Sequence, residues 1–448
     1  MLWPRLFVCL TLIGTLFISV PALAQHVHEP TAAQPPHEHQ PAGDVVSLFP
    51  HRDASGTAWL PDVTPMYGLQ HTWRGWELML HGLAFAQFLY EPGDIHRTGG
   101  YSTHQFGSVN WGMLMARRPA GAGRVGVRAM LSAEPLTIPG CGYLNQLATG
   151  ETCEGDTIHD RQHPHDLFME LAGDYDRPIR GLLRWQVYAG LAGEPALGPA
   201  AFPHRLSASP NPIAPISHHW LDATHITFGL VTTGLYDRRW KAEVSVFNGR
   251  EPDEGRADLD LGPLDSVSAR VSFLPTDTLA FQVSAGHLNE AEAGFPPEPP
   301  TDVNRATASV TYHRPLRQGG IWATTIALGV NSAREVIPQG EFTADTFALM
   351  LETAVNLGDR HTWFGRAEAV EKPAHDLHAH EYATSVFTVG KLQGGYVHYF
   401  APRKGLVSGV GGSVSAGLVP RELTHGYYRR VEPGFSLFFT VRPASHVM

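Results

Sequence analysis

Apolar and polar residues alternate along most of this chain, from near Trp73 almost to the C-terminus. This period of two is that of a β-strand whose two faces meet different surroundings. A soluble β-sandwich also alternates, but a train of this length favours an antiparallel, up-and-down transmembrane β-barrel, with lipid outside and water inside. The segment 239–248 shows the pattern, with Trp240, Ala242, Val244 and Val246 on one face and Lys241, Glu243 and Ser245 on the other.

The pattern predicts about sixteen strands, or fourteen if one hairpin is merged. Most of them match a tilted membrane strand of about 9–11 residues better than a soluble strand of about five or six. An even number places both termini in the periplasm. The approximate ranges are 72–90, 104–116, 123–133, 166–176, 182–193, 222–236, 239–249, 265–274, 278–287, 303–313, 320–331, 345–357, 361–371, 384–400, 404–418 and 433–442.

The connections between these strands alternate between short turns and long loops, as periplasmic turns and extracellular loops do in such barrels. The longest loops are 133–165 and 193–221, and the long loops are acidic whereas the short turns are rich in Arg. Four acids precede a proline where an upward strand ends, and proline ends strand pairing. They form either solvated strand stops or a carboxylate ring that concentrates cations at the mouth. These acids are Glu91, Glu134, Glu194 and Glu251.

The N-terminal part differs from the rest. Residues 1–24 have the pattern of a secretory signal peptide, with Arg5 before an apolar stretch and small residues at the cleavage site. Residues 25–65 are rich in His and Pro and have too little apolar content to pack, which predicts a flexible periplasmic tail. The barrel then occupies residues 66–448, in the outer membrane of a Gram-negative cell.

Composition narrows the partners and the compartment. The formal net charge of −10 and the lack of a basic patch in the sequence exclude nucleic acid as a partner. We expect outer-membrane lipid and small ions or solutes instead, and association into homo-oligomers stays open. Cys9 lies in the signal peptide, which leaves Cys141 and Cys153 as one plausible disulfide pair. That ring contributes about 3 kcal/mol in the chain-entropy model and implies an oxidising compartment.

Charged residues fall on the face of the strands opposite the apolar one. An Arg or Lys that faces lipid at mid-depth costs roughly 2–4 kcal/mol, so we expect these side chains to face the lumen. Opposite charges on neighbouring strands predict ion pairs. These pairs either stabilise the wall of the barrel or control the passage of solutes through the lumen. The expected lumen charges are Arg128, Glu170, Arg184, Lys241, Glu243, Arg270, Arg305, Glu352, Arg366 and Glu368.

Two polar clusters are candidates for a metal site, because imidazoles with carboxylates suit Cu, Zn or Ni. The sequence requires no cofactor, and the same residues could form a hydrogen-bonded plug or carry out proton chemistry. A third cluster, His375, His378 and His380, could join only if its loop folds inward. The candidate ligands are His159, Asp160, His163, His165 and Asp166 in the first cluster, and His218, His219 and His225 in the second.

An enzyme is the least favoured alternative. A hydrolase needs a nucleophile held by a base that is itself oriented by a third group. Ser217, His218 and Asp222 are present, but the sequence has no Gly-x-Ser-x-Gly elbow. We therefore expect no catalytic residues.

Three boxes of sequence carry a family resemblance: 153–171, which contains His-Asp-Arg-Gln-His-Pro-His-Asp-Leu-Phe-Met-Glu-Leu, 218–226 and 247–254. They resemble a family of uncharacterised porin-like outer-membrane β-barrel proteins of Gram-negative bacteria. The resemblance covers most of the mature chain. It implies a barrel and an outer-membrane location, and it supplies no substrate and no catalytic residues.

Taken together, the sequence predicts a porin-like outer-membrane channel that favours cations and handles transition-metal ions. Acidic loops would enrich cations at the mouth, and the lumen charges would set the passage. The competing prediction is a barrel plugged by its own loops, which serves as a surface binding protein or a scaffold. An outer-membrane enzyme is the third.

Overall fold

The structure is a computed structural model that describes residues 50–91, 103–292, 300–337, 340–382, 384–424 and 428–444. The chain divides into two units, residues 1–46 and residues 47–448, and the described residues belong to the second. The predicted signal peptide and residues 25–49 of the predicted tail therefore lie outside the described residues.

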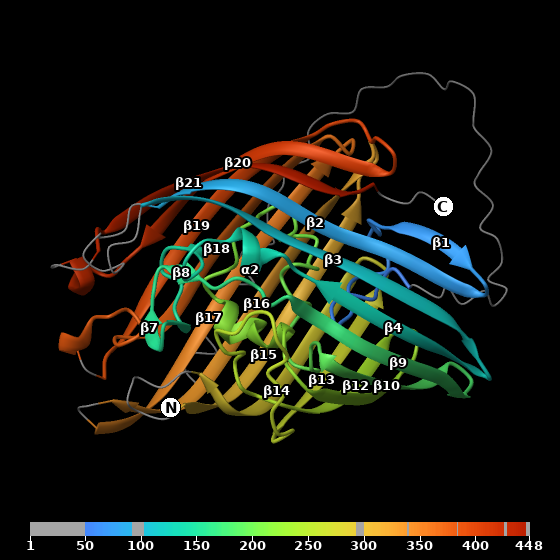
Figure 1. Ribbon diagram of the computed structural model, residues 1–448, viewed down its shortest axis with the longest axis horizontal. Coiled ribbons are helices and arrows are strands. Elements are labelled where there is room, and N and C mark those ends of the chain that lie inside the picture. The colour runs from blue at the N-terminus through green and yellow to red at the C-terminus, as the bar shows by residue number, and fades with distance from the viewer. Residues whose placement is uncertain are drawn as a thin grey trace, which may run out of the picture. The chain divides into compact units, whose positions relative to one another are not determined.

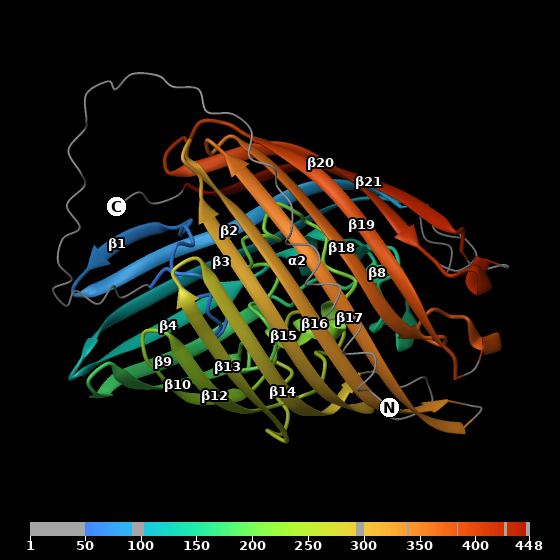
Figure 2. The same cartoon turned by 180° about the vertical axis from the view of Figure 1, so that it is seen from behind.

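Sixteen antiparallel strands form a closed barrel (Figures 1 and 2). Each strand pairs with the next along the chain, and the last closes the barrel by pairing with the first, Ala86 opposite Phe439. This confirms the predicted fold and strand number. The strands are β2 (Trp76–Tyr90), β3 (His104–Ala120), β4 (Gly123–Leu131), β9 (Phe168–Arg180), β10 (Leu183–Ala192), β11 (Leu230–Tyr236), β12 (Trp240–Phe247), β13 (Ser266–Thr276), β14 (Leu279–Glu292), β15 (Thr301–Pro315), β16 (Gly320–Ile337), β17 (Gly340–Leu357), β18 (His361–Pro373), β19 (Val386–Tyr399), β20 (Leu406–Leu418) and β21 (Val431–Pro443).

Two predicted strands are partly wrong. The range 72–90 is interrupted at Arg74 and Gly75, whose positive φ angles of 50° and 80° make a tight turn. The short strand β1 (Leu69–Trp73) precedes that turn and pairs with the start of β2. The range 222–236 is a strand only from Leu230, because the residues before it form helical turns inside the barrel.

The remaining elements are short and belong to the connections. Among the described residues, no helix is long and apolar enough to cross a membrane. These elements are α2 (Glu134–Thr137), β5 (Tyr143–Leu144), β6 (Glu151–Cys153), β7 (Asp156–Ile158), β8 (Arg161–Gln162), α3 (His218–Leu221), η1 (Ala223–His225), η2 (His380–Tyr382) and η3 (Arg421–Thr424).

The outer face of the barrel is apolar. In β13, burial alternates residue by residue, and Val267, Val271 and Phe273 are exposed whereas the polar residues between them are buried. Neighbouring strands continue this face, since Val271 stands opposite Val283 of β14. A closed barrel with an apolar outside satisfies every backbone group while it presents hydrocarbon to lipid. The protein is therefore an outer-membrane β-barrel.

The inside of the barrel is filled by three segments of the same chain: residues 50–66, 132–167 and 193–229. In both views, irregular chain crosses the space that the strands enclose (Figures 1 and 2). Segment 193–229 is buried along most of its length. The predicted tail boundary is wrong for residues 50–65, because this stretch packs against the barrel: Ala58 and Leu60 are buried, and Thr64 bonds His313.

The lipid-facing surface can be tested at Val271, the central residue of β13. We expect Val271→Arg to lower the free energy of unfolding by about 2–4 kcal/mol, because it places a charge in hydrocarbon. The same change at Leu182, which is 73% exposed in the turn between β9 and β10, should have little effect. Urea titration in lipid vesicles checks this, and equal effects at both positions would contradict the orientation.

Candidate functional site

The predicted lumen charges line the inner face of the wall. Nine of the ten are buried, and Arg184 is half-buried. Two pairs of opposite charges on neighbouring strands form, Arg128 with Glu170 at 3.4 Å and Arg366 with Glu352 at 3.2 Å. Arg184 contacts Asp176 at 2.6 Å, on the strand that also carries Glu170 but nearer the turn.

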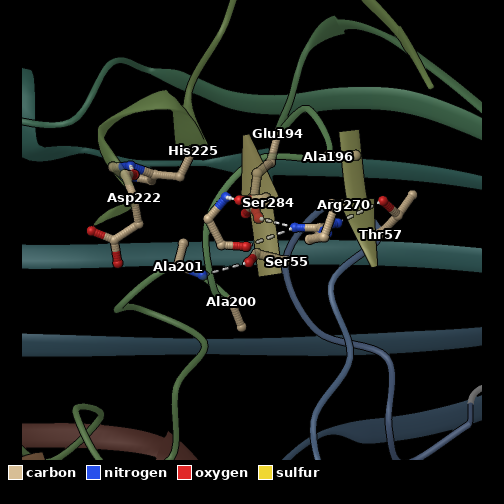
Figure 3. A network of polar contacts seen from close by, with 12 residues as sticks. Ser55, Thr57, Glu194, Ala196, Ala200, Ala201, Asp222, His225, Arg270 and Ser284 are labelled. Atoms are coloured by element: carbon tan, nitrogen blue, oxygen red, sulfur yellow. Dashed lines mark hydrogen bonds and ion pairs between the residues drawn. The ribbon is translucent and has the colours of Figure 1, made fainter. Parts of the chain in front are cut away.

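The cations of the wall hold the inward segments in place (Figure 3). Arg270 of β13 donates to Thr57 Oγ1 at 2.9 Å and to the Gly198 carbonyl at 3.2 Å, and lies 3.5 Å from Glu194. Lys241 of β12 donates to the Thr57 carbonyl. These contacts tie segments 50–66 and 193–229 to one side of the wall, and Ser55 joins the two segments by accepting from the Ala201 amide at 2.8 Å.

Segment 193–229 is also anchored to a second part of the wall, at β17. Its Arg205 donates to Glu352 of β17 at 2.7 Å and to Asp222 within the segment. Burial alone would raise the pKa of Asp222, but Arg205 and His218 outweigh it and hold this pKa well below its ordinary value. Buried charges with matched partners therefore fix the segment to the wall at two places, β13 and β17.

Three of the four acids that precede proline are buried. They are therefore neither solvated residues at the ends of strands nor an open ring of carboxylates at the mouth of the barrel. Glu91 contacts Lys391 at 2.8 Å, and Glu134 accepts from the Asn110 and His165 amides at 3.1 and 2.9 Å. Glu194 is buried beside Arg270, and its burial raises its pKa to about 7. The fourth, Glu251, is half-buried and faces two histidines.

Three predicted ligands surround Phe202. The rings of His165 and His218 lie 5.3 and 5.1 Å from that of His225. Each Nδ1 atom is held by an oxygen, His165 by Glu134 at 2.9 Å, His218 by Asp222 at 2.8 Å and His225 by the Asp222 carbonyl at 2.9 Å. Burial, together with His218 and His165, lowers the pKa of His225 well below its ordinary value. This group ties segment 132–167 to segment 193–229.

A second group combines His163 and His219 with two acids. The Nε2 atoms of His163 and His219 lie 3.4 and 4.0 Å from the same oxygen, Oε1 of Glu251. Glu292, at the end of β14, contacts Nδ1 of His219 at 3.1 Å, and the Pro164 carbonyl contacts Nδ1 of His163 at 2.9 Å. Potential ligand atoms of His219, Glu251 and Glu292 all lie within 4.8 Å of one another.

This geometry has the features of a transition-metal site. Each Nδ1 donates its proton to an oxygen, so each Nε2 faces the carboxylate either with a second proton or with a lone pair that a cation could accept. With metal–ligand bonds of about 2.0–2.2 Å, the edge of a tetrahedron is about 3.4 Å. The distance from His163 Nε2 to Glu251 Oε1 matches that edge at 3.4 Å, and the distance from His219 Nε2 is longer, at 4.0 Å. Glu292 has the place of the carboxylate that orients a metal-bound histidine.

The other predicted ligands have structural partners. His159 contacts Asp160 at 2.9 Å, and Asp160 also accepts from the Leu147 amide at 2.6 Å. Asp166 lies 3.4 Å from Arg256. These contacts fix the path of segment 132–167, which also contains the predicted disulfide between Cys141 and Cys153, with 5.6 Å between their Cα atoms.

The third histidine cluster folds inward. The ring of His378 lies 4.4 Å from that of His159. His375 and Asp376 line a cavity of about 60 Å³ together with His219 and Glu292. The side chain of His380 lies outside the described residues. This cavity lies beside the His163, His219 and Glu251 group, so space for an ion and its water adjoins it.

The geometry around Ser217 differs from that of a hydrolase. Its hydroxyl donates to Glu368 at 2.7 Å, and the Ser217 amide donates to the same carboxylate at 3.0 Å. His218 is held by Asp222, so the base and the nucleophile point to different partners.

The sequence did not identify Glu251 and Glu292 as the acidic partners of His163 and His219. Glu251 stood out only as an acid before proline, and Glu292 lies outside the predicted strand 278–287. Glu251 meets His163 because the loop 248–265 folds over segment 132–167, where Glu254 accepts from the Glu154 and Gly155 amides at 2.8 and 3.0 Å. No local spacing shows this fold-back, which depends on tertiary contacts.

Arg205 tests how firmly the lumen is closed. We expect Arg205→Met to cost about 3–5 kcal/mol, because it leaves Glu352 and Asp222 buried with less compensation. Segment 193–229 should then become open to chymotrypsin, with cleavage after Phe202 or Trp220 seen by mass spectrometry. The exposed pair of Arg239 and Asp277, 3.0 Å apart, supplies the control: Arg239→Met should cost under about 1 kcal/mol. Equal protease resistance in both variants would contradict the anchoring role.

No protein-family model matches the chain, and no curated protein sequence matches it. Solved barrels are similar to it in fold. The outer-membrane channel DcaP of Acinetobacter baumannii is 11% identical over 84% of this chain and 100% of its own, with a TM-score of 0.48. An anion-selective porin from Comamonas acidovorans is 11% identical over 82% and 99%, with a TM-score of 0.46. Salmonella typhi OmpF is 9% identical over 84% and 100%, with a TM-score of 0.48. Likenesses this distant carry no conclusion about solute or mechanism.

Proposed function

We propose that this porin-like outer-membrane barrel handles divalent transition-metal ions, through a site formed by His163, His219 and Glu251. The observation that carries the proposal is the convergence of two imidazole Nε2 atoms on one carboxylate oxygen, at 3.4 and 4.0 Å. Two imidazoles with one carboxylate bind zinc in proteins and leave a fourth position for water or an exchanging ligand. Imidazole donors also suit Cu and Ni.

The position of the site fits an ion that arrives from outside the cell. Glu251 lies in the loop after β12 and Glu292 at the end of β14, both on the side of the long loops. Long loops are extracellular in barrels of this kind. The acids Glu251 and Glu292 are half-buried, so they attract cations in partial contact with solvent. We propose that this mouth gives the barrel its preference for cations.

The filled lumen favours a second candidate, a closed barrel that binds the metal ion at the surface without conducting it. Segment 193–229 is held to the wall at β17 by Arg205 and at β13 by Arg270. The two candidates share the metal site and differ in whether segment 193–229 moves.

Metal binding can be measured on the full chain in detergent. We expect one Zn²⁺ per barrel by isothermal titration, and His219→Ala should abolish this stoichiometric binding because it removes the ligand that both acids face. Glu292→Gln should weaken it about 10–100-fold, as loss of an orienting carboxylate does.

His287→Ala is the matched control, because His287 lies on the same strand as Glu292 but is exposed and bonds Asn304. Heat-modifiable mobility on gels shows that each variant is folded. Zn²⁺ binding that survives His219→Ala unchanged would refute this site.

Conductance separates the two candidates. In planar lipid bilayers bathed in KCl, a channel should pass K⁺ in preference to Cl⁻. Under a KCl gradient, its reversal potential should have the sign expected of a cation-selective pore. Arg205→Met should increase the current because it releases segment 193–229. A folded barrel that stays silent in both forms, yet binds Zn²⁺, would reject the channel and retain the closed binding protein.

A further inference from the structure

A second cavity lies at the opposite end of the lumen and has different chemistry. Its volume is about 130 Å³, and segment 50–66, β2, β3 and residues 203–209 enclose it. It lies on the side of the short turns, next to Tyr67 and Arg442. Its soft and imidazole donors are Met66, Met79, Met113, Met115, His51, His81 and His204.

The strand register places these donors side by side. Met79 stands directly opposite Met115, and His81 directly opposite Met113. Met113 in turn stands opposite Met130 of β4. Side chains in such positions have Cβ atoms about 4.5–5.5 Å apart. Sulfur and imidazole nitrogen therefore form two adjacent rows on the inner wall.

Two of the sulfur atoms already share a polar partner. The Gln70 amide nitrogen donates to Met66 Sδ at 3.2 Å and lies 4.0 Å from Met79 Sδ. These contacts place the sulfur atoms of Met66 and Met79 near the same amide group.

Two of the imidazoles lie next to each other. The rings of His81 and His204 lie 5.7 Å apart, and both contact Trp111. The Nε2 atom of His81 is buried, and within the described part of the chain it has no hydrogen-bond partner. Loss of hydration, with His81 and Arg128 nearby, lowers the pKa of His204 to about 3, so this ring is neutral at physiological pH. A neutral ring offers a lone pair to a metal.

Packing alone does not explain this composition. Methionine is the adaptable filler of irregular cores, and six of the nine methionines in the chain gather in this region. A cavity nevertheless remains in their midst, and it is lined by a buried nitrogen atom without a partner. Three charged residues border the cavity: Asp53 and Arg117, which lie 2.8 Å apart, and Arg442, whose guanidinium lies over the rings of Tyr67 and Tyr399 at 3.8 and 4.7 Å. The thioether and imidazole donors themselves are neutral and soft.

We propose that this cavity binds a soft monovalent metal ion, Cu⁺, through the thioethers of Met79, Met113 and Met115 and Nε2 of His81. Thioether ligands select Cu⁺. A neutral set of sulfur donors holds a monovalent ion without the charge that Zn²⁺ or Ni²⁺ requires. The inference stands independently of the His163, His219 and Glu251 site, with which it shares no residue.

The wild-type protein provides the first test. The full chain, labelled with ¹³C at the methionine methyl groups, is titrated in micelles with Ag⁺, a redox-inert probe for Cu⁺. We expect the methyl signals of Met79, Met113 and Met115 to shift together and saturate at one Ag⁺ per barrel, whereas that of Met350, in a different core cluster, stays in place. Signals that remain unmoved, or that all move equally, would overturn the proposal.

Variants provide the second test. The double change Met113→Leu and Met115→Leu conserves volume closely and should weaken Ag⁺ binding at least about tenfold, a difference of about 1.4 kcal/mol. Met350→Leu is the matched control and should bind as the wild type does. His219→Ala should retain Ag⁺ binding while it loses Zn²⁺, which separates the two sites. Unchanged Ag⁺ affinity in the double variant would overturn the assignment.

Discussion

The structure depends on one constraint: a cation on the inner wall of a filled barrel must find its acceptors inside the protein. Arg128, Lys241 and Arg270 are buried, and a buried charge without a partner costs several kcal/mol. In an open pore, water would solvate them. Here the carbonyls of Gly56 and Thr57 accept from Arg128 and Lys241, so the wall dictates the path of segment 50–66.

This constraint explains which parts of the fold could be predicted from the sequence. The strands were predictable because a lipid face and an inner face impose a period of two on every strand. Segment 50–65 was not, because it has little apolar content and is held by polar contacts to wall cations far away in the sequence, such as Arg270 to Thr57. The start of the predicted strand 222–236 failed for a related reason: in a filled lumen, loop residues such as Ile226 and Phe228 are buried just as strand residues are.

The candidate site was half predictable. His163 and His219 stood out because imidazoles are rare enough in clusters to suggest chemistry. Their acidic partners come from another loop and from the end of β14, and only tertiary contacts such as that between the Leu167 amide and the Arg256 carbonyl bring the loop 248–265 over them. Strand parity assigns a face to each residue of a strand. It gives no information on how a loop returns over the barrel, which is where Glu251 lies.

Charge balance inside the barrel bears on where ion selectivity can arise. Along the wall, Arg366 is matched by Glu352 and Arg270 by Glu243, so these pairs carry little net charge. If segment 193–229 moved, it would withdraw Arg205 together with Glu194 and Asp222. The ten lumen charges that remain are six cations and four carboxylates, so the wall would keep a net positive charge. A preference for cations would then have to arise at the two ends of the lumen, where carboxylates and imidazoles on one side and thioethers on the other offer donors of different hardness.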